Sequence, residues 1–317
     1  MLVTPMVAKA GVATAGQGFG FRSDKAVVRT LAAKSNVRER ALECLGQLPP
    51  FSPILMRVLA SLASEDVSFA KLADLIEKDT VLAGNILRLV NSALYGLKGT
   101  VNSVRHAVNL LGLTKIRNVT LGLSVARMWT NTKTSPGWSR ARFNLHSLGV
   151  AILADLLSPE VRVNYPEGAF TAGLFHDLGH LLIAVGLPKE HAEVMNLLQR
   201  GYGTLLECEK DVLDLDHAEL SAEALAIWNL PVSIQVAVRF HHDLEADPTT
   251  VHPGELRLSQ LVSAADVYTN QMGLSIDTLI HSDGDGEAAL AALGVGDDLP
   301  RILEQFENEF TTIRALF

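Results

Sequence analysis

The sequence predicts an all-α protein in which a smaller helical block precedes a larger helical bundle. In nearly every long segment, apolar residues recur at spacings of three and four, which is the period of an amphipathic helix. The sequence has no alternating run long enough to predict a β-sheet. The chain has 317 residues, of which 48% are hydrophobic and 20% charged, a composition typical of globular proteins with a sizeable core.

The smaller block is expected over residues 49–129. The stretch "SFAKLADLIEKDTVLAGNILRLVNSALYG" holds two helical runs, with Ser68 and Thr80 where N-caps are needed and Gly96 at the stop. In "VNSVRHAVNLLGLTKIRNVTLGLSVARMW", Gly112 separates two further runs. Their predicted caps are Ser103 and Thr114.

The larger bundle is expected over residues 141–268, after a loop rich in turn-forming residues, "TNTKTSPGWSRA". We expect its helices around the segments "FNLHSLGVAILADLL", "AGLFHDLGHLLIAVG", "HAEVMNLLQR", "HAELSAEALAIWNL", "SIQVAVRFHH" and "LRLSQLVSAADVYTNQM". The domain is therefore predicted to span residues 41–268. An N-terminal arm and helix over residues 1–40 precede it, and a C-terminal helical extension over residues 269–317 follows it.

Charge and termini limit the classes of partner. The formal net charge of −8 repels nucleic acid and anionic membranes, so neither is expected as a partner. The first residues lack the basic start and apolar run of an export signal, and two cysteines are too few for a disulfide framework. We expect a cytoplasmic protein.

Polar residues interrupt one of the most apolar segments. In "AFTAGLFHDLGHLLIAV", His176, Asp177 and His180 stand among core-type residues. An unsatisfied buried polar group costs about 1–3 kcal/mol, and a bare charge costs far more. His176 and His180 are four residues apart, which would place them on one face of a helix. One interpretation is a structural pair that is hydrogen-bonded within the core. The other is a metal-binding site.

Similar residues beside other apolar helical runs favour the metal. Imidazole and carboxylate suit iron, manganese, nickel or zinc, and two carboxylates offset much of the charge of a divalent ion. The predicted ligands are His146, His176, Asp177, His217, His241, His242 and Asp266. For His180 both a ligand role and a position at the solvent-exposed rim stay open.

The order of these motifs resembles a known family. "FHDLGH", with an upstream helical histidine and the aspartate of "SAADVY", is similar to the H…HD…D pattern of the HD superfamily of metal-dependent phosphohydrolases. The blocks "ILRLVNSALYG" and "IWNLPVSIQVAVRFHH", in this order, resemble the HDOD family, the HD-related output domains of bacterial signalling proteins. The resemblance covers residues 45–266 and implies an HD-domain-like helical bundle.

The resemblance also implies roles for individual residues. His146, His176, Asp177 and Asp266 match the minimal ligand set of HD enzymes. The remaining histidines, His217, His241 and His242, are similar to the extra ligands of HD-GYP phosphodiesterases. Two features depart from the HD-GYP pattern: His180 replaces a lysine, and the segment after His242 has no GYP motif.

Two functions follow as expectations. The first is a signal-transduction output domain that retains a metal site and acts through a signalling protein partner or a small nucleotide-like ligand. The second is a metal-dependent phosphohydrolase or nucleotide phosphodiesterase, in which Asp177 would orient or deprotonate the attacking water. A module that binds a phosphorylated messenger without cleaving it lies between them. The sequence does not distinguish among these three functions, and it leaves the oligomeric state open.

Overall fold

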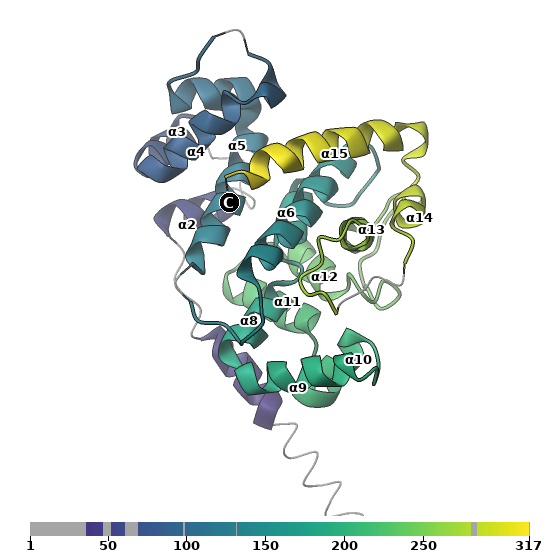
Figure 1. Ribbon diagram of the computed structural model, residues 1–317. Coiled ribbons are helices and arrows are strands. Elements are labelled where there is room, and N and C mark those ends of the chain that lie inside the picture. Colours follow the sequence, from purple (N-terminus) through teal and green to yellow (C-terminus); the bar gives the residue numbers. More distant parts are fainter. Residues whose placement is uncertain are drawn as a thin grey trace, which may run out of the picture.

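The computed structural model describes residues 36–46, 52–60, 69–97, 99–130, 132–279 and 284–316. Within these ranges the all-α prediction is confirmed, because the β-structure there is limited to an isolated bridge between Val163 and Leu256. The helices form a smaller block at one end and a larger bundle beside it (Figure 1).

The smaller block contains α2 (Pro53–Ala60), α3 (Phe69–Glu77), α4 (Thr80–Val90), the 3-10 turn η1 (Ala93–Tyr95) and α5 (Val104–Met128). Helices α2, α3 and α4 all pack against α5 (Figure 1). The predicted break at Gly112 is confirmed, because this residue has φ 80° and ψ 163° inside α5.

The helix caps in this block were predicted in part. Ser103 caps α5 as expected, by accepting the backbone N–H of His106. The expectation for Thr80 was wrong, since Asp79 is the N-cap of α4 and Thr80 is the first helical residue. A carboxylate accepts two N–H groups at once there, from Val81 at 3.1 Å and Leu82 at 3.0 Å. Ser68 lies outside the described residues.

The larger bundle is organised around α6 (Arg140–Leu157), which packs against α7, α13 and α15 (Figure 1). The other elements are η2 (Pro166–Gly168), α7 (Ala169–Phe175), α8 (Leu178–Gly186), α9 (Pro188–Gln199), α10 (Leu205–Leu213), α11 (His217–Ile227), α12 (Val232–Arg239), α13 (Leu258–Gln271), α14 (Gly286–Ala291), η3 (Gly296–Asp298) and α15 (Leu299–Arg314). Helix α11 packs between α8 and α12, which places the start of α11 near the end of α7.

One predicted helix is two helices. The segment around "AGLFHDLGHLLIAVG" was expected to be continuous, but α7 ends at Phe175 and α8 begins at Leu178. Asp177 has φ −103° and ψ 15° and takes the N-cap position of α8. Apolar periodicity continues across such a short break, so the sequence pattern did not reveal it.

The same segment satisfies the length and apolarity expected of a membrane-crossing helix. It extends over Pro166–Gly186, and 94% of its most apolar window is buried inside the protein. Helices α6, α11 and α13 pack against its two halves. The segment is therefore part of the protein core.

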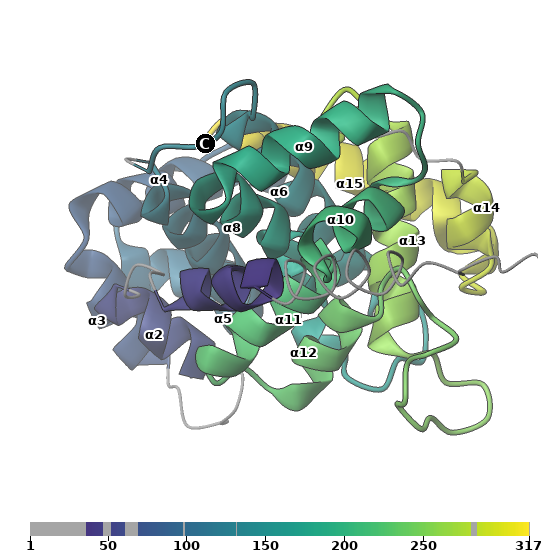
Figure 2. The same ribbon diagram turned by 90° about the horizontal axis from the view of Figure 1, so that it is seen from below.

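Both ends of the described chain pack on the bundle. A helix over residues 36–45, purple in Figure 2, contacts α9 through an Arg40–Glu190 ion pair and α11 through Arg38 and Glu219. At the other end, α15 runs along α6 and reaches the smaller block, where Glu309 pairs with Lys115. The division into residues 1–40, 41–268 and 269–317 stays a prediction.

Candidate metal centre

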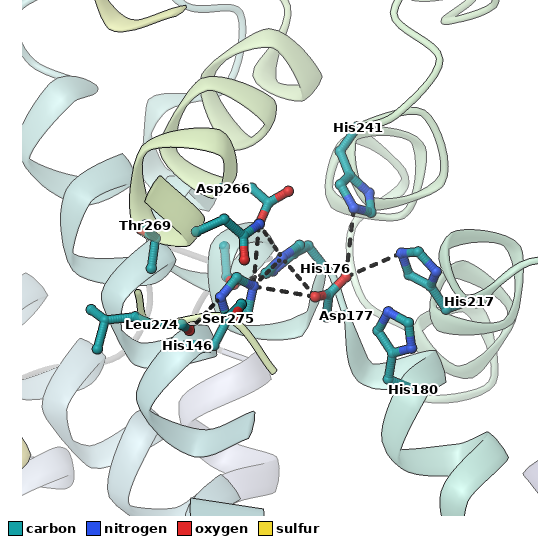
Figure 3. A network of polar contacts seen from close by, with 12 residues as sticks. His146, His176, Asp177, His180, His217, His241, Asp266, Thr269, Leu274 and Ser275 are labelled. Carbon is teal, nitrogen blue, oxygen red and sulfur yellow. Dashed lines mark hydrogen bonds and ion pairs between the residues drawn. The ribbon is translucent and has the colours of Figure 1, made fainter. Parts of the chain in front are cut away.

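The fold brings all of the predicted site residues to one place in the bundle, and Figure 3 shows all of them except His242. His146 comes from α6, Asp266 from α13, and the two adjacent residues His176 and Asp177 from the break between α7 and α8. From the opposite side, α8 contributes His180, the start of α11 His217, and the turn after α12 His241 and His242. All of them are buried except His242, which is exposed.

Four of these side chains form a first group: His146, His176, Asp177 and Asp266. The Nε2 atoms of His146 and His176 are 3.2 Å apart. Asp177 Oδ2 lies 3.2 Å from His146 Nε2 and 3.3 Å from His176 Nε2. Asp266 Oδ1 lies 3.2 Å from His146 Nε2 and 3.6 Å from His176 Nε2. Two imidazoles and two carboxylates therefore face one point.

The second group uses the other oxygen of the same aspartate. Asp177 Oδ1 lies 3.2 Å from His217 Nε2 and 3.7 Å from His241 Nε2. The Nε2 atoms of His217 and His242 are 3.0 Å apart. Asp177 thus stands between two groups of donors, one at each carboxylate oxygen (Figure 3).

The outer nitrogens of the rings show which atoms face inward. Nδ1 of His146, His176 and His241 lies 2.6–3.0 Å from a backbone carbonyl oxygen, and Nδ1 of His217 lies 2.7 Å from the Glu209 carboxylate. These oxygens only accept hydrogen bonds, so each Nδ1 carries a proton. In the neutral ring Nε2 then presents a lone pair, and lone pairs that face each other require a cation between them.

Two inward atoms also lack hydrogen bonds. Asp177 Oδ1 and His241 Nε2 are buried and have no hydrogen-bond partner among the residues that the structure describes. Buried polar atoms without partners are rare in proteins because each costs about 1–3 kcal/mol. These residues therefore suit a cation bound by carboxylate oxygen and imidazole nitrogen.

In the metal-free protein, protons on the histidine rings supply the positive charge between the facing donor atoms. Burial alone lowers the pKa of an imidazole, but the Asp177 and Asp266 carboxylates outweigh burial and raise the pKa of His176 to about 10. The pKa of His217 is raised well above its usual range, since Glu209 and Asp177 overcome the burial of the ring. Burial opposes ionisation of Asp177, yet the adjacent protonated His176 holds the pKa of its carboxyl well below the usual value. Divalent cations would displace these protons.

The expectation that His176 and His180 lie on one face of a helix was wrong, because the break between α7 and α8 separates them. His180 also belongs to a different group of potential ligands from His176. The His180 ring stacks on the His217 ring, with centroids 3.9 Å apart and an interplanar angle of 20°. Burial and the neighbouring His217 lower the pKa of His180 to about 4, which keeps the ring neutral. A ligand role for His180 stays a prediction.

Glu209 is a site residue that the sequence interpretation missed. It lies on α10, a helix that was not predicted, and is 1% exposed. With His180 and His217 it forms a third group of close potential ligands. Thr204 and Glu207 form a capping box, and this T-x-x-E spacing could have predicted the start of the helix.

A glycine lets the two halves of the site approach each other. A Cβ added to Gly179 would lie 2.1 Å from the His217 carbonyl oxygen, so a larger residue does not fit there. The Gly179 N–H donates to Ser221 Oγ at 2.7 Å, and that hydroxyl donates to the His217 carbonyl at 2.7 Å. This contact joins the start of α8 to the start of α11.

Comparison with protein families agrees with this geometry. The family model of the HDOD domain matches residues 48–244. The chain belongs to the HDOD domain family. The family resemblance seen in the sequence is thereby confirmed.

Solved structures share the fold of this HDOD protein. An HDOD domain protein of unknown function from Geobacter sulfurreducens is 25% identical with a TM-score of 0.71, covering 89% of this chain and 99% of that chain. A candidate phosphohydrolase from Shewanella amazonensis SB2B is 22% identical with a TM-score of 0.63, covering 86% and 98%. A candidate signal transduction protein from Marinobacter aquaeolei VT8 is 19% identical with a TM-score of 0.67, covering 89% and 66%. The last two similarities concern the fold alone.

An uncharacterized protein from Treponema pallidum (strain Nichols) is 24% identical over 212 residues. The alignment covers 66% of this chain and 40% of the relative. The HDOD protein thus spans less than half the length of the curated relative it matches.

Proposed function

We propose that this HDOD protein is a signal-transduction module that holds divalent cations at the two groups sharing Asp177. The observation that supports this most strongly is the orientation of the rings, whose protonated Nδ1 atoms point outward while Nε2 lone pairs converge on carboxylates. The proposed ligands are His146, His176, Asp177 and Asp266 at the first position, and His217, His241, His242 and Asp177 at the second.

The donor set indicates which metals suit the centre. It contains imidazole nitrogens and carboxylate oxygens but no thiolate. Iron, manganese, nickel and zinc all accept such ligands. Which of these metals the site binds is therefore left to experiment.

Metal binding would connect separate parts of the bundle. The first group comes from α6, α13 and the break after α7, whereas the second comes from α11 and the turn after α12. Bound cations would hold α11 and α12 against the central helices through Asp177. We infer that metal loading sets the arrangement that a signalling protein partner or a small nucleotide-like ligand recognises. A cytoplasmic location without nucleic-acid or membrane partners stays part of this proposal.

A second candidate function, a phosphohydrolase or nucleotide phosphodiesterase, is favoured by the completeness of the donor set and by the exposure of His242. Bound divalent cations would supply Lewis-acid activation of a water molecule and of a phosphate ester. Asp177 would orient that water, while Asp266 and the histidines would hold the site in place. The burial of the other donors favours the regulatory role, because a substrate needs access to the reacting atoms.

Metal content tests the site itself. Elemental analysis of the purified wild type is compared with a His176→Ala/Asp177→Ala double variant, with His106→Ala as control because His106 is exposed on α5. We expect metal in the wild type and control and none in the double variant, with circular dichroism showing that all three are folded. Equal metal content in the double variant and the wild type, or none in any, would refute the metal site.

Turnover separates the two functions. The metal-loaded wild type is assayed with p-nitrophenyl phosphate and bis(p-nitrophenyl) phosphate, beside Asp177→Ala. A metal-containing protein without hydrolysis supports the regulatory role. Hydrolysis that Asp177→Ala abolishes, with the fold retained, establishes the phosphohydrolase.

A further inference from the structure

We propose that Glu209 is a positioning residue for the second metal position, where it holds the His217 ring with Nε2 directed at Asp177. This inference rests on the proposed metal site and assigns a role to a residue outside the ligand set. Glu209 contacts the outer side of His217, on the Nδ1 edge of the ring.

The contacts of Glu209 fix both the place and the tautomer of His217. Its Oε2 accepts the His217 backbone N–H at 3.0 Å and the Nδ1–H at 2.7 Å. The first bond holds the start of α11, and the second keeps a proton on Nδ1. The same contact directs Nε2 at Asp177 Oδ1, which is 3.2 Å away, so in the metal-bound form Nε2 is the nitrogen that offers its lone pair. A carboxylate bonded to the outer nitrogen also makes an imidazole a better metal ligand.

The other oxygen of the same carboxylate extends the arrangement to a second ring. Glu209 Oε1 lies 3.3 Å from His180 Nδ1, and the His180 ring stacks on His217. Glu209 thus spans the Nδ1 edges of two stacked imidazoles. Rotation of the His217 ring away from Asp177 would break contacts with both residues.

A purely structural role accounts poorly for this carboxylate. Glu209 is buried on the apolar face of α10, beside Cys208 and near Leu213. A buried carboxylate costs several kcal/mol unless it is well paired, and an apolar side chain would complete that face at no such cost. The partners found for Glu209 in the described part of the chain are His217 and His180, and neither is a permanent cation.

Zinc titration of three proteins tests the role of Glu209. Metal-free wild type, Glu209→Gln and the control Glu193→Gln are titrated with Zn²⁺ by isothermal calorimetry. Gln keeps the size of the side chain but removes its charge, and Glu193 is an exposed glutamate on the neighbouring helix α9. We expect two equivalents to bind to the wild type and to the control. In Glu209→Gln the first equivalent should bind normally and the second about 10–100-fold more weakly.

A spectroscopic measurement separates positioning from general destabilisation. In the zinc-loaded proteins, the ¹⁵N resonances of the His217 ring report which nitrogen carries the proton. We expect protonated Nδ1 in the wild type and an altered Nδ1–H signal in Glu209→Gln, with His146 unchanged. Such a selective change at one ring is not expected from a loss of packing, which would lower the melting temperature and weaken both equivalents alike.

The outcomes are distinguishable. Two equivalents of wild-type affinity in Glu209→Gln would overturn the role of Glu209 and leave the metal site intact. Equal weakening of both equivalents, with an unchanged His217 signal, would also overturn it. A wild type that binds no zinc, iron, manganese or nickel would refute the proposed function together with this inference.

Discussion

Substitution of Gly179 by alanine would test how closely α8 and α11 must approach to form the centre. The added Cβ would lie 2.1 Å from the His217 carbonyl oxygen and 2.7 Å from its carbonyl carbon and Cα. Ordinary contacts begin at 3.4 Å, so the closest pair is 1.3 Å too short. All three atoms belong to the backbone, so no side-chain rotation relieves the overlap.

The required displacement determines the expected effect. Moving α8 and α11 apart by about 1 Å would separate the Asp177 side of the site from His217, and metal sites tolerate deviations of only about 0.2 Å. Overpacking of this kind costs about 1–3 kcal/mol of unfolding free energy. We expect Gly179→Ala to lower the unfolding free energy by this amount and to lose the second equivalent of metal.

The assay combines urea unfolding with metal analysis, and Gly84→Ala is the matched control. Gly84 is exposed inside α4 and has an ordinary helical backbone, and no atom of the described residues lies within 4 Å of an added Cβ. Alanine there should stabilise the protein by about 0.5–1 kcal/mol and leave metal content unchanged. A Gly179→Ala protein with wild-type stability and two metal equivalents would refute the close approach.

Three further predictions follow. Asp79→Ala removes the N-cap of α4 and should lower the unfolding free energy by about 1 kcal/mol in urea titrations. Asp79→Asn can still cap the helix and should lower the unfolding free energy by less. Equal losses in the two variants would contradict the capping role. Ser221→Ala leaves the buried Gly179 N–H without its acceptor and should cost about 1–3 kcal/mol, whereas a neutral result would mean that water replaces the hydroxyl. The raised pKa of His176, about 10, predicts that the metal-free protein loses stability as pH rises from about 6.5 toward 10, because in that range the unfolded chain has released a proton that the folded protein still holds. Zinc should remove this pH dependence and should release protons when it binds at pH 7. Calorimetry in buffers of different ionisation enthalpy measures the number of protons released. Binding without proton release would contradict the raised pKa of His176.

Much of the fold could be predicted from periodicity. Helices α3, α4 and α5, the break at Gly112 and most of the helices from α6 to α13 follow from apolar spacing and turn residues. Helix α10 was missed because its nine residues carry a mixed pattern in which a buried glutamate occupies an apolar position. The capping box at Thr204 was present in the sequence and went unused.

The predicted site residues were found from the chemistry of their surroundings. Histidines and aspartates beside apolar runs required partners, and the structure places all seven predicted ligands in two adjoining groups. The spacing also predicted that His176 and His180 would lie on one face of a helix, and this failed because helical geometry was extended across the break between α7 and α8. The partner of His217 lies eight residues upstream on another helix, and no spacing rule connects Glu209 to it.

By itself, the sequence determined the helical class, the positions of most helices and the residues that needed a shared partner, because local spacing and the cost of burying polar groups act on residue types. Only the tertiary structure decided which residues meet, since Asp177 faces two groups only when α7 and α8 separate around it and Gly179 lets α11 approach. Which ring nitrogen of each histidine points inward also depends on contacts made by the far side of the ring. Those contacts come from elements distant in the chain, and a sequence pattern does not specify them.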